Sequence, residues 1–208
     1  MRVNAEAVAF AAGACHKIGA ALVYPSTDYV FSGVSNRPYR PEDSTGPLNA
    51  YGRSKLAGEV AARRAGRWLV VRTSWLYGQG GPNFVDTIRK LAGERERLEV
   101  VDDQLGRPTW TGTLAKAMVE LVMRGAEGVL HVTDQGEPVS WYGLAREIVE
   151  RTGERAEVVP VPSSRFPRPA RRPSYSVLDC SGAERLLGEA LPEWRGVLGG
   201  YLERPGEK

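Results

Sequence analysis

The sequence predicts an α/β fold built on a largely parallel β-sheet, and two patterns carry that prediction. Segments of helical composition alternate with short apolar segments along most of the 208 residues. The apolar segments are continuous rather than alternating, which is typical of strands that helices cover on both faces. With 42% hydrophobic residues, the chain also carries enough apolar side chains to bury a sizeable core.

The first helix and strand follow from local composition. The alanine-rich residues 5–19 favour a helix that begins almost at the first residue. The apolar residues 20–24 favour a buried strand, and the polar residues Ser26, Thr27 and Asp28 follow it. Because functional groups gather at the carboxyl ends of parallel strands, these three side chains are candidates for a site.

The later elements repeat this order. After a loop rich in Gly, Pro and Asn at 32–49, we expect a helix over 50–65 and a second buried strand over 68–74. Ser140 is placed to cap a helix that ends near residue 152. The other expected elements are a helix at 84–96, a strand at 98–101, a helix at 113–123, a strand at 129–132 and a pair of helices within 181–203.

Composition argues against several classes of partner. The net charge of +3 is small, and no block of like charge suggests a nucleic-acid or membrane surface. No apolar run approaches the roughly 18 residues of a membrane span, and the first residues do not open a signal sequence, so we expect a cytoplasmic protein. Cys15 and Cys180 lack metal-ligand spacing, and we expect no metal site.

Tyr51 and Lys55 stand four residues apart near the start of a predicted helix, so their side chains share one face. A tyrosine, with a pKa of about 10, is a useful acid near neutral pH only if its phenolate gains roughly 4 kcal/mol of stabilisation. A nearby ammonium group and a cationic nicotinamide ring can supply it. A hydroxyl from Ser26 or Thr27 would polarise the carbonyl oxygen that the tyrosine protonates, which suits hydride transfer to a ketone.

Such a pair is by itself as typical of helix surface packing as of catalysis, but its surroundings are more specific. The chain resembles the extended short-chain dehydrogenase/reductase family, and within it the dTDP-4-dehydrorhamnose reductases. The resemblance covers nearly the whole chain. The strings that carry it are at 26–31, 47–59, 72–78, 83–84, 101–104, 108–109, 169–173 and 176–179. The first two are shared with sugar-nucleotide epimerases and dehydratases, whereas those at 102–104 and 170–173 are much more specific to the reductases.

The resemblance implies an incomplete doubly wound parallel sheet, of the NAD(P)-binding Rossmann-like type, with a small C-terminal substrate-binding subdomain. Residues 1–135 would form the C-terminal portion of the Rossmann-like domain with interleaved substrate-side segments. Residues 136–208 would form mainly the substrate-binding subdomain. Within them, residues 158–176 contain five prolines and are a candidate lid or substrate-binding segment.

The resemblance also implies reduction of the 4-keto group of dTDP-4-dehydro-6-deoxy-L-mannose to dTDP-L-rhamnose, with NADPH or NADH as hydride donor. Tyr51 would be the general acid, Lys55 would bind the nicotinamide ribose and lower the tyrosine pKa, and Thr27 would hydrogen-bond the substrate carbonyl. Ser26 and Ser74 would join Tyr51 and Lys55 at the cofactor. A dTDP-sugar is the expected partner, and a homodimer is the candidate assembly.

Further residues are expected to contact the sugar or its diphosphate. They are Asp28, Trp75, Asn83, Gln104 and Arg171. For Trp75, a place in the buried core is the competing interpretation. An arginine near a pyrophosphate has an electrostatic reason, but Arg171 is equally well explained as a solvated surface residue.

The Gly-x-x-Gly-x-x-Gly turn that holds a dinucleotide pyrophosphate in such proteins is absent from the sequence. We therefore expect a truncated or mis-started version of a longer reductase, impaired by the loss of its cofactor loop. The strand at 21–25 would then be an exposed apolar edge.

Two other functions remain open from the sequence. One is an epimerase or dehydratase acting on another nucleotide sugar, which would share the Tyr51 and Lys55 pair. The other is a non-catalytic protein that binds or senses a nucleotide sugar. Turnover of dTDP-4-dehydro-6-deoxyhexose with NADPH separates the reductase from both.

Overall fold

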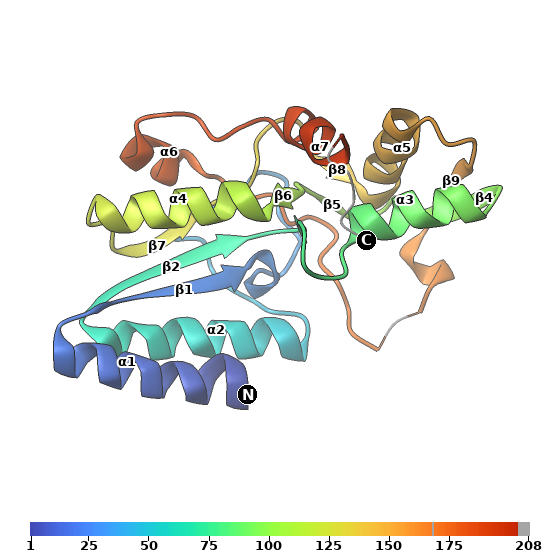
Figure 1. Cartoon of the computed structure of the whole chain (residues 1–208). Helices are drawn as coiled ribbons and strands as arrows, with labels where there is room; N and C mark the ends of the chain where they lie inside the picture. The colour runs from blue at the N-terminus through green and yellow to red at the C-terminus, as the bar shows by residue number, and fades with distance from the viewer. Residues whose placement is uncertain (168, 204–208) are drawn as a thin grey trace.

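The computed structural model describes residues 1–167 and 169–203 and has helices on both faces of a parallel sheet (Figure 1). The sheet has three strands in the order β1 (Ala21–Thr27), β2 (Arg67–Thr73) and β7 (Gly128–His131). Both pairs are parallel, and their register places Thr27 beside Thr73. The predicted α/β fold is confirmed.

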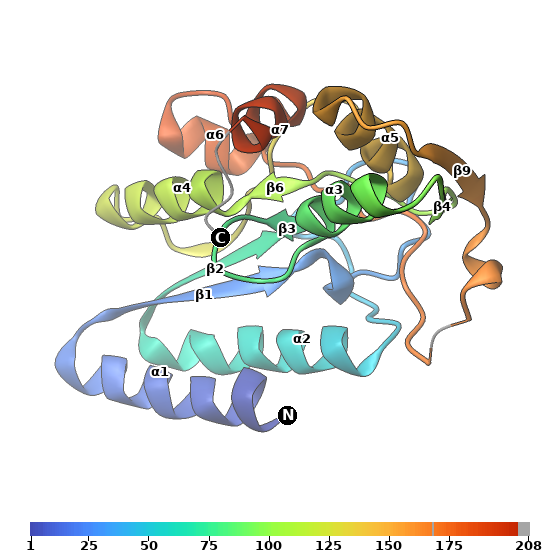
Figure 2. The same ribbon diagram turned by 45° about the vertical axis from the view of Figure 1, so that its right-hand side comes forward.

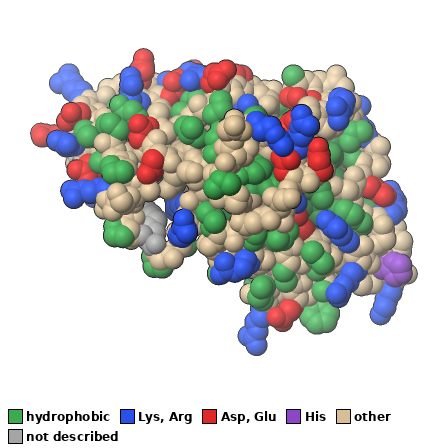
Figure 3. All heavy atoms as spheres, turned by 180° about the vertical axis from the view of Figure 1, so that it is seen from behind, with side chains coloured by type: hydrophobic (Ala, Val, Ile, Leu, Met, Phe, Trp, Pro, Cys, Tyr) green, Lys and Arg blue, Asp and Glu red, His purple; other side chains and the backbone are tan. Residues whose placement is uncertain are grey.

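Two helices cover one face of this sheet. They are α1 (Ala7–Ile18), which follows a π-helical turn at Arg2–Glu6, and α2 (Ala50–Ala62), which continues into a 3-10 turn at Arg63–Ala65. Both lie below the sheet in Figure 1. Phe10 and Ile18 of α1 are exposed. Seen from behind, apolar and basic side chains are mixed over the lower part of the molecule (Figure 3).

The other face is covered by α4 (Thr111–Met123) and α6 (Ser181–Leu187), above the sheet in Figure 1. Leu121 and Ala183 are fully buried there and pack in one apolar cluster with Val71 of β2. Burial of each large apolar side chain contributes about 1.5–3 kcal/mol, so this cluster holds the upper layer on the sheet.

The remaining elements share a second core. Their shared core includes Leu144, Ile148 and Trp194, all almost completely buried. The elements are α3 (Phe84–Glu94), β4 (Arg97–Val101), α5 (Trp141–Thr152), β9 (Glu157–Val161) and α7 (Trp194–Leu202). Of these, α5, β4 and β9 lie at the right-hand end of the molecule in Figure 2, with α7 nearer its middle.

β9 was not predicted, because its residues open the proline-rich segment at 158–176. Val158, Val159 and Val161 favour a strand, and Pro160 is tolerated because only one neighbour, β4, pairs with it. The parallel pair of β4 and β9 forms its own sheet and does not extend the central one. A 3-10 turn at Ser163–Arg165 follows.

Two pairs of short strands connect the central sheet with the elements of the second core. β3 (Leu76–Tyr77) pairs in parallel with β6 (Thr109–Trp110), and β5 (Leu105–Gly106) pairs antiparallel with β8 (Val139–Ser140). Ser140 caps α5 as predicted, since its Oγ accepts a hydrogen bond from the Gly143 N–H at 3.0 Å. No helix within the described residues is long and apolar enough to cross a membrane.

β1 lies at the edge of the central sheet, and within the described residues only β2 pairs with it. This matches the expected edge position. Ala21 and Pro25 are exposed along the strand, while Ser26 and Thr27 at its carboxyl end are buried.

A buried ion pair joins α2 to the sheet. Arg72 of β2 donates two hydrogen bonds to the carboxylate of Glu59, at 2.9 Å and 2.8 Å, and both side chains are at most 4% exposed. Ser26 of β1 donates a third hydrogen bond to the same carboxylate. Arg72 also donates to the carbonyl oxygen of Pro41, so four segments meet at this pair.

We expect Arg72→Met to lower the free energy of unfolding by about 3–5 kcal/mol, because it leaves the buried Glu59 charge without its hydrogen-bonded counter-ion. Urea denaturation measures this loss. The double variant Glu59→Gln/Arg72→Met should recover part of the stability, since no isolated charge remains. Arg124→Met, which breaks an exposed pair with Glu120, is the matched control and should change stability by less than about 1 kcal/mol. A loss in Arg72→Met no larger than in this control would contradict the prediction.

Candidate active site

The candidate site lies at the carboxyl edge of the sheet, where β1 ends beside the start of α2. Asn49 caps this helix: its side-chain oxygen accepts from the Gly52 N–H at 2.8 Å, and its amide donates to the carbonyl oxygen of Arg171 at 2.8 Å. A Cβ at Gly52 would overlap the carbonyl oxygen of Tyr29. The glycine therefore lets the helix start lie directly against the turn that follows β1.

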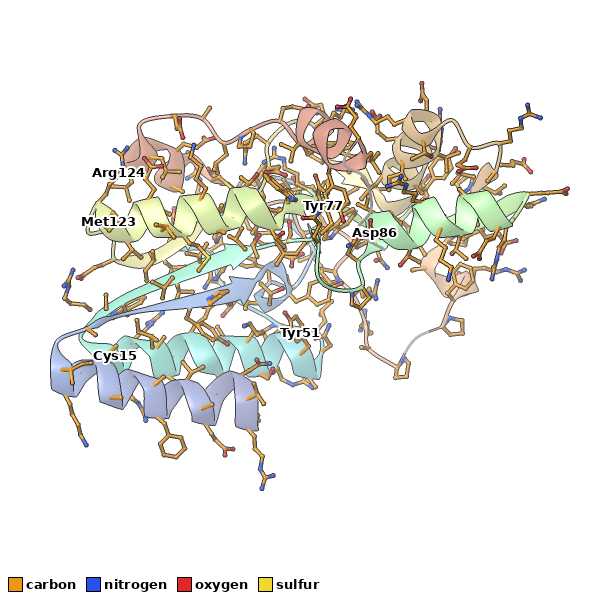
Figure 4. All side chains as sticks on the ribbon, in the orientation of Figure 1. Cys15, Tyr51, Tyr77, Asp86, Met123 and Arg124 are labelled. Atoms are coloured by element: carbon orange, nitrogen blue, oxygen red, sulfur yellow. The ribbon has the colours of Figure 1, made fainter. Side chains whose placement is uncertain are left out.

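Tyr51 stands on the first turn of α2, at the end of the helix nearest the end of β1 (Figure 4). Its side chain is 51% exposed, and the Tyr29 ring contacts it edge-on with centroids 6.0 Å apart. Burial of part of the ring raises the pKa of Tyr51, hydrogen bonding with Thr27 lowers it, and the nearby Asp28 raises it. The phenol thus meets Thr27 and keeps its proton at neutral pH.

Lys55 lies one helical turn beyond Tyr51. Its Nζ donates to the carbonyl oxygen of Pro25 at 2.6 Å and lies 4.2 Å from the centroid of the Tyr24 ring. Burial lowers the pKa of Lys55, while Glu59 raises it. An ammonium group has three donors, so two remain for a ligand.

Thr27 and Asp28 lie buried at the end of β1, beside Tyr51 and Lys55. The Thr27 hydroxyl donates to Asp28 Oδ1 at 2.9 Å and accepts from the Tyr29 N–H at 3.2 Å. Asp28 is 2% exposed, and its Oδ2 has no hydrogen-bond partner among the described residues. Burial raises the pKa of Asp28 to about 6, against the opposing effects of the Ser176 and Thr27 hydroxyls.

Ser74 and Trp75 follow β2 at the same edge of the sheet. Ser74 is buried, and its Oγ donates to the carbonyl oxygen of Arg107 at 2.7 Å. The Trp75 ring stacks on Trp141 with centroids 3.6 Å apart and an angle of 8° between the planes. Trp75 is half-buried, which leaves part of the ring accessible at this edge.

The other predicted site residues differ in their surroundings. Ser26 is buried and donates a hydrogen bond to the Glu59 carboxylate. Asn83 caps α3, because its side-chain oxygen accepts a hydrogen bond from the N–H of Asp86 at 2.9 Å (Asp86 is labelled in Figure 4). The Asn83 amide donates to Gly78, Gly81 and Asp86, and none of these hydrogen bonds reaches Tyr51. Gln104 is half-buried beside β5, and Arg171 is exposed. Their roles remain predictions.

Three residues of this region were not singled out in the sequence. Glu59 follows Lys55 by four residues and therefore shares its helix face, a spacing that makes it a detectable candidate. Arg72 lies in the string at 72–78, but the sequence does not indicate which residue it pairs with. Trp141 follows the cap residue Ser140, and no local pattern marks it.

The Lys55 ammonium and the Tyr51 phenol carry donors of the kind that suit the hydroxyls of a ribose. The described residues include no glycine-rich turn at a helix start that would take the pyrophosphate. They also include no group of three or more metal-ligating side chains.

Comparisons with known proteins agree with this geometry. The family model described as the RmlD substrate binding domain matches residues 1–205. The dTDP-4-dehydrorhamnose reductase of Burkholderia thailandensis is 43% identical over 215 aligned positions, which cover 95% of this chain and 72% of the relative.

Solved structures show the same fold. A dTDP-4-dehydrorhamnose reductase from Clostridium acetobutylicum superposes with a TM-score of 0.91 and 39% identity, over 96% of this chain and 71% of its own. One from Bacillus anthracis, in complex with NADP, superposes with a TM-score of 0.90 and 38% identity, over 95% of this chain and 70% of its own. The chain therefore belongs to the dTDP-4-dehydrorhamnose reductase family and carries its RmlD substrate-binding domain.

Proposed function

We propose that this chain reduces the 4-keto group of dTDP-4-dehydro-6-deoxy-L-mannose to give dTDP-L-rhamnose, with NADPH or NADH as hydride donor. The observation that carries the proposal is the cluster of Thr27, Tyr51 and Lys55 at the carboxyl edge of the sheet. The relatives named above support the substrate, and the NADP complex of the Bacillus anthracis reductase supports the donor.

The residues divide the proton chemistry between them. The nicotinamide supplies a hydride to C4 of the sugar, and the Tyr51 hydroxyl gives its proton to O4, so that the ketone becomes an alcohol. The Thr27 hydroxyl, whose one hydrogen is donated to Asp28 Oδ1 in the chain without ligand, turns to donate it to the same oxygen as negative charge develops there. Lys55 stabilises the phenolate that remains, and Tyr51 regains a proton from solvent because its ring is half exposed.

Burial raises the pKa of Tyr51 in the chain without ligand, and Lys55 is not among the causes of this shift, so the lowering that the resemblance implies is not present there. A proton donor has to carry its proton before the substrate binds, and burial keeps the phenol neutral until then. Lys55 acts after the transfer, when the negative charge appears one helical turn away on Tyr51.

The buried carboxyl group of Asp28 belongs to the same proposal as a contact that positions the sugar. Its unpartnered oxygen is a costly feature to keep in a fold, and such features cluster at functional sites. A homodimer and a cytoplasmic location, both expected from the sequence, stay predictions.

We expect Tyr51→Phe to lower the rate of NADPH oxidation by about 10²–10⁴-fold with dTDP-4-dehydro-6-deoxyhexose as substrate, since the variant has no proton to give. The loss of cofactor absorbance measures the rate. Tyr142→Phe, in α5, is the matched control and should retain full activity. If the unmodified chain consumes no NADPH but the nucleotide sugar raises its melting temperature, a binding function replaces catalysis.

NADPH should bind this chain more weakly than it binds the Clostridium acetobutylicum relative, because the sequence contains no Gly-x-x-Gly-x-x-Gly turn for the pyrophosphate. Calorimetric titration of the two proteins under identical conditions measures the difference. Equal affinities would show that other residues of this chain hold the pyrophosphate.

Asp28→Asn should stabilise the protein at pH 7.5 by up to about 3 kcal/mol. The pKa of Asp28 is about 6 in the fold, against about 3.9 in an unfolded chain, so the folded state binds more protons between these two values. Wild-type stability should therefore fall as pH rises from about 4 to 6, and the advantage of the variant should vanish below pH 4.

Urea denaturation at several pH values measures this dependence. Glu150→Gln, at an exposed position of α5, is the control and should follow the wild-type profile. An Asp28→Asn advantage that is constant with pH would contradict the assigned cause.

A further inference from the structure

The indole of Trp75 is held between two protein surfaces. One face stacks on Trp141, with 3.6 Å between centroids and an angle of 8° between the rings. The other side lies against Gly106, where a Cβ would stand 2.6 Å from Cε2 and 2.8 Å from Nε1 of the indole. Phe84 supports Trp141 in turn, at 4.6 Å. We call Gly106, Trp75 and Trp141 the tryptophan clamp.

The backbone of Trp75 is held in place as firmly as its ring. Its φ of 48° makes it the one non-glycine residue of the described chain in the left-handed region, which is unfavourable for a bulky side chain. The carbonyl oxygen of Trp75 accepts a hydrogen bond from the Thr109 N–H at 3.2 Å. Such a conformation persists only where surrounding contacts enforce it.

A short series of contacts connects the clamp to the catalytic cluster. The Asp28 carboxyl interacts with the Ser176 hydroxyl, and the Ser176 N–H donates to the carbonyl oxygen of Leu105 at 2.8 Å. Leu105 directly precedes Gly106 in β5. The clamp is therefore linked to Asp28, the neighbour of Thr27, through Ser176 and Leu105.

We propose that Gly106 and Trp141 are positioning residues that turn the edge of Trp75, rather than a face, toward the sugar of the nucleotide substrate. The inference rests on the proposed function. Because both faces are covered, the accessible part of the half-buried Trp75 lies at its edge. The edge carries the positive end of the ring quadrupole and the Nε1–H donor.

The edge of an indole ring binds different chemical groups from those that its face binds. An aromatic face attracts the apolar C–H groups of a sugar, whereas the edge and its N–H attract oxygen atoms. The Trp75 indole nitrogen has no hydrogen bond to a described residue, so its donor is available. The clamp therefore contacts a hydroxyl or keto oxygen of the hexose, and contributes to affinity for the sugar but not for the nucleotide.

The clamp itself is tested without any ligand. Two stacked indoles couple their transitions and give a paired positive and negative band in the far-ultraviolet circular dichroism spectrum. Trp75→Phe and Trp141→Phe should each abolish this signal, whereas the control Trp68→Phe, at the opposite end of β2, should keep it. Persistence of the signal in both clamp variants would overturn the stack.

The sugar contact is tested by calorimetric titration with dTDP-L-rhamnose and with dTDP, whose affinity ratio isolates the sugar. Trp75→Phe, Trp141→Ala and Gly106→Ala should each lower this ratio by about five- to tenfold, the contribution of one hydrogen bond, and leave dTDP affinity unchanged. Trp141→Phe should stay within about twofold of wild type, since an aromatic ring again covers Trp75. Gly200→Ala, where an added Cβ meets nothing within 4 Å, is the matched glycine control.

Three results would overturn the proposal in different ways. An unchanged ratio in Trp75→Phe, with a reduced one in Trp75→Ala, would show that a ring face and not the N–H meets the sugar. An unchanged ratio in Trp141→Ala and Gly106→Ala would remove their positioning role. If the wild-type chain does not distinguish dTDP-L-rhamnose from dTDP, the proposed function fails together with the contact, even where the dichroism signal confirms the clamp.

Discussion

The geometry of this site depends on one interaction, the buried ion pair between Glu59 of α2 and Arg72 of β2. Within the described chain, it is the ion pair in which both side chains are buried, and it also receives the Ser26 hydroxyl from β1. Tyr51, Lys55 and Glu59 follow one another at four-residue intervals on one face of α2. A contact at Glu59 therefore fixes the position of Tyr51 and Lys55 along the helix axis relative to the end of β1. A bidentate carboxylate–guanidinium contact fixes both distance and rotation, which an apolar contact does not.

This buried ion pair fixes the geometry of the site at a cost in folding stability. Removing two charges from water costs several kcal/mol per ion, and a well-packed apolar pair is often at least as stable. The Asp28 carboxyl, buried with one oxygen unpartnered, and the left-handed Trp75 are further costs within the same small region. Their concentration at the carboxyl edge of the sheet, and not across the core, is the distribution expected where a fold is shaped for ligand chemistry.

The substrate side of the site is built from segments that are distant in sequence. The segment at 171–178 joins them, since the Arg171 carbonyl accepts from Asn49 at the start of α2 and the Ser176 N–H donates to Leu105 in β5. β5 in turn carries Gly106 under the Trp75 ring. Tyr51 at the start of α2 and the tryptophan clamp are therefore connected through this proline-containing segment, part of which the sequence indicated as a candidate substrate-binding segment.

The sequence by itself determined the alternation of helices and strands, the polar ends of β1 and β2, the shared face of Tyr51 and Lys55, and the family. Each of these is written in residues close together along the chain, where helical and strand periodicity operate. Tertiary structure alone decided that Glu59 pairs with Arg72 and that Trp75 stacks on Trp141. It also decided that residues 157–161 add a strand beside β4 and that the Asn83 side-chain oxygen caps α3. These contacts join segments that only the folded chain brings together, and no local pattern encodes which partner a buried charge, a ring or a strand edge will find.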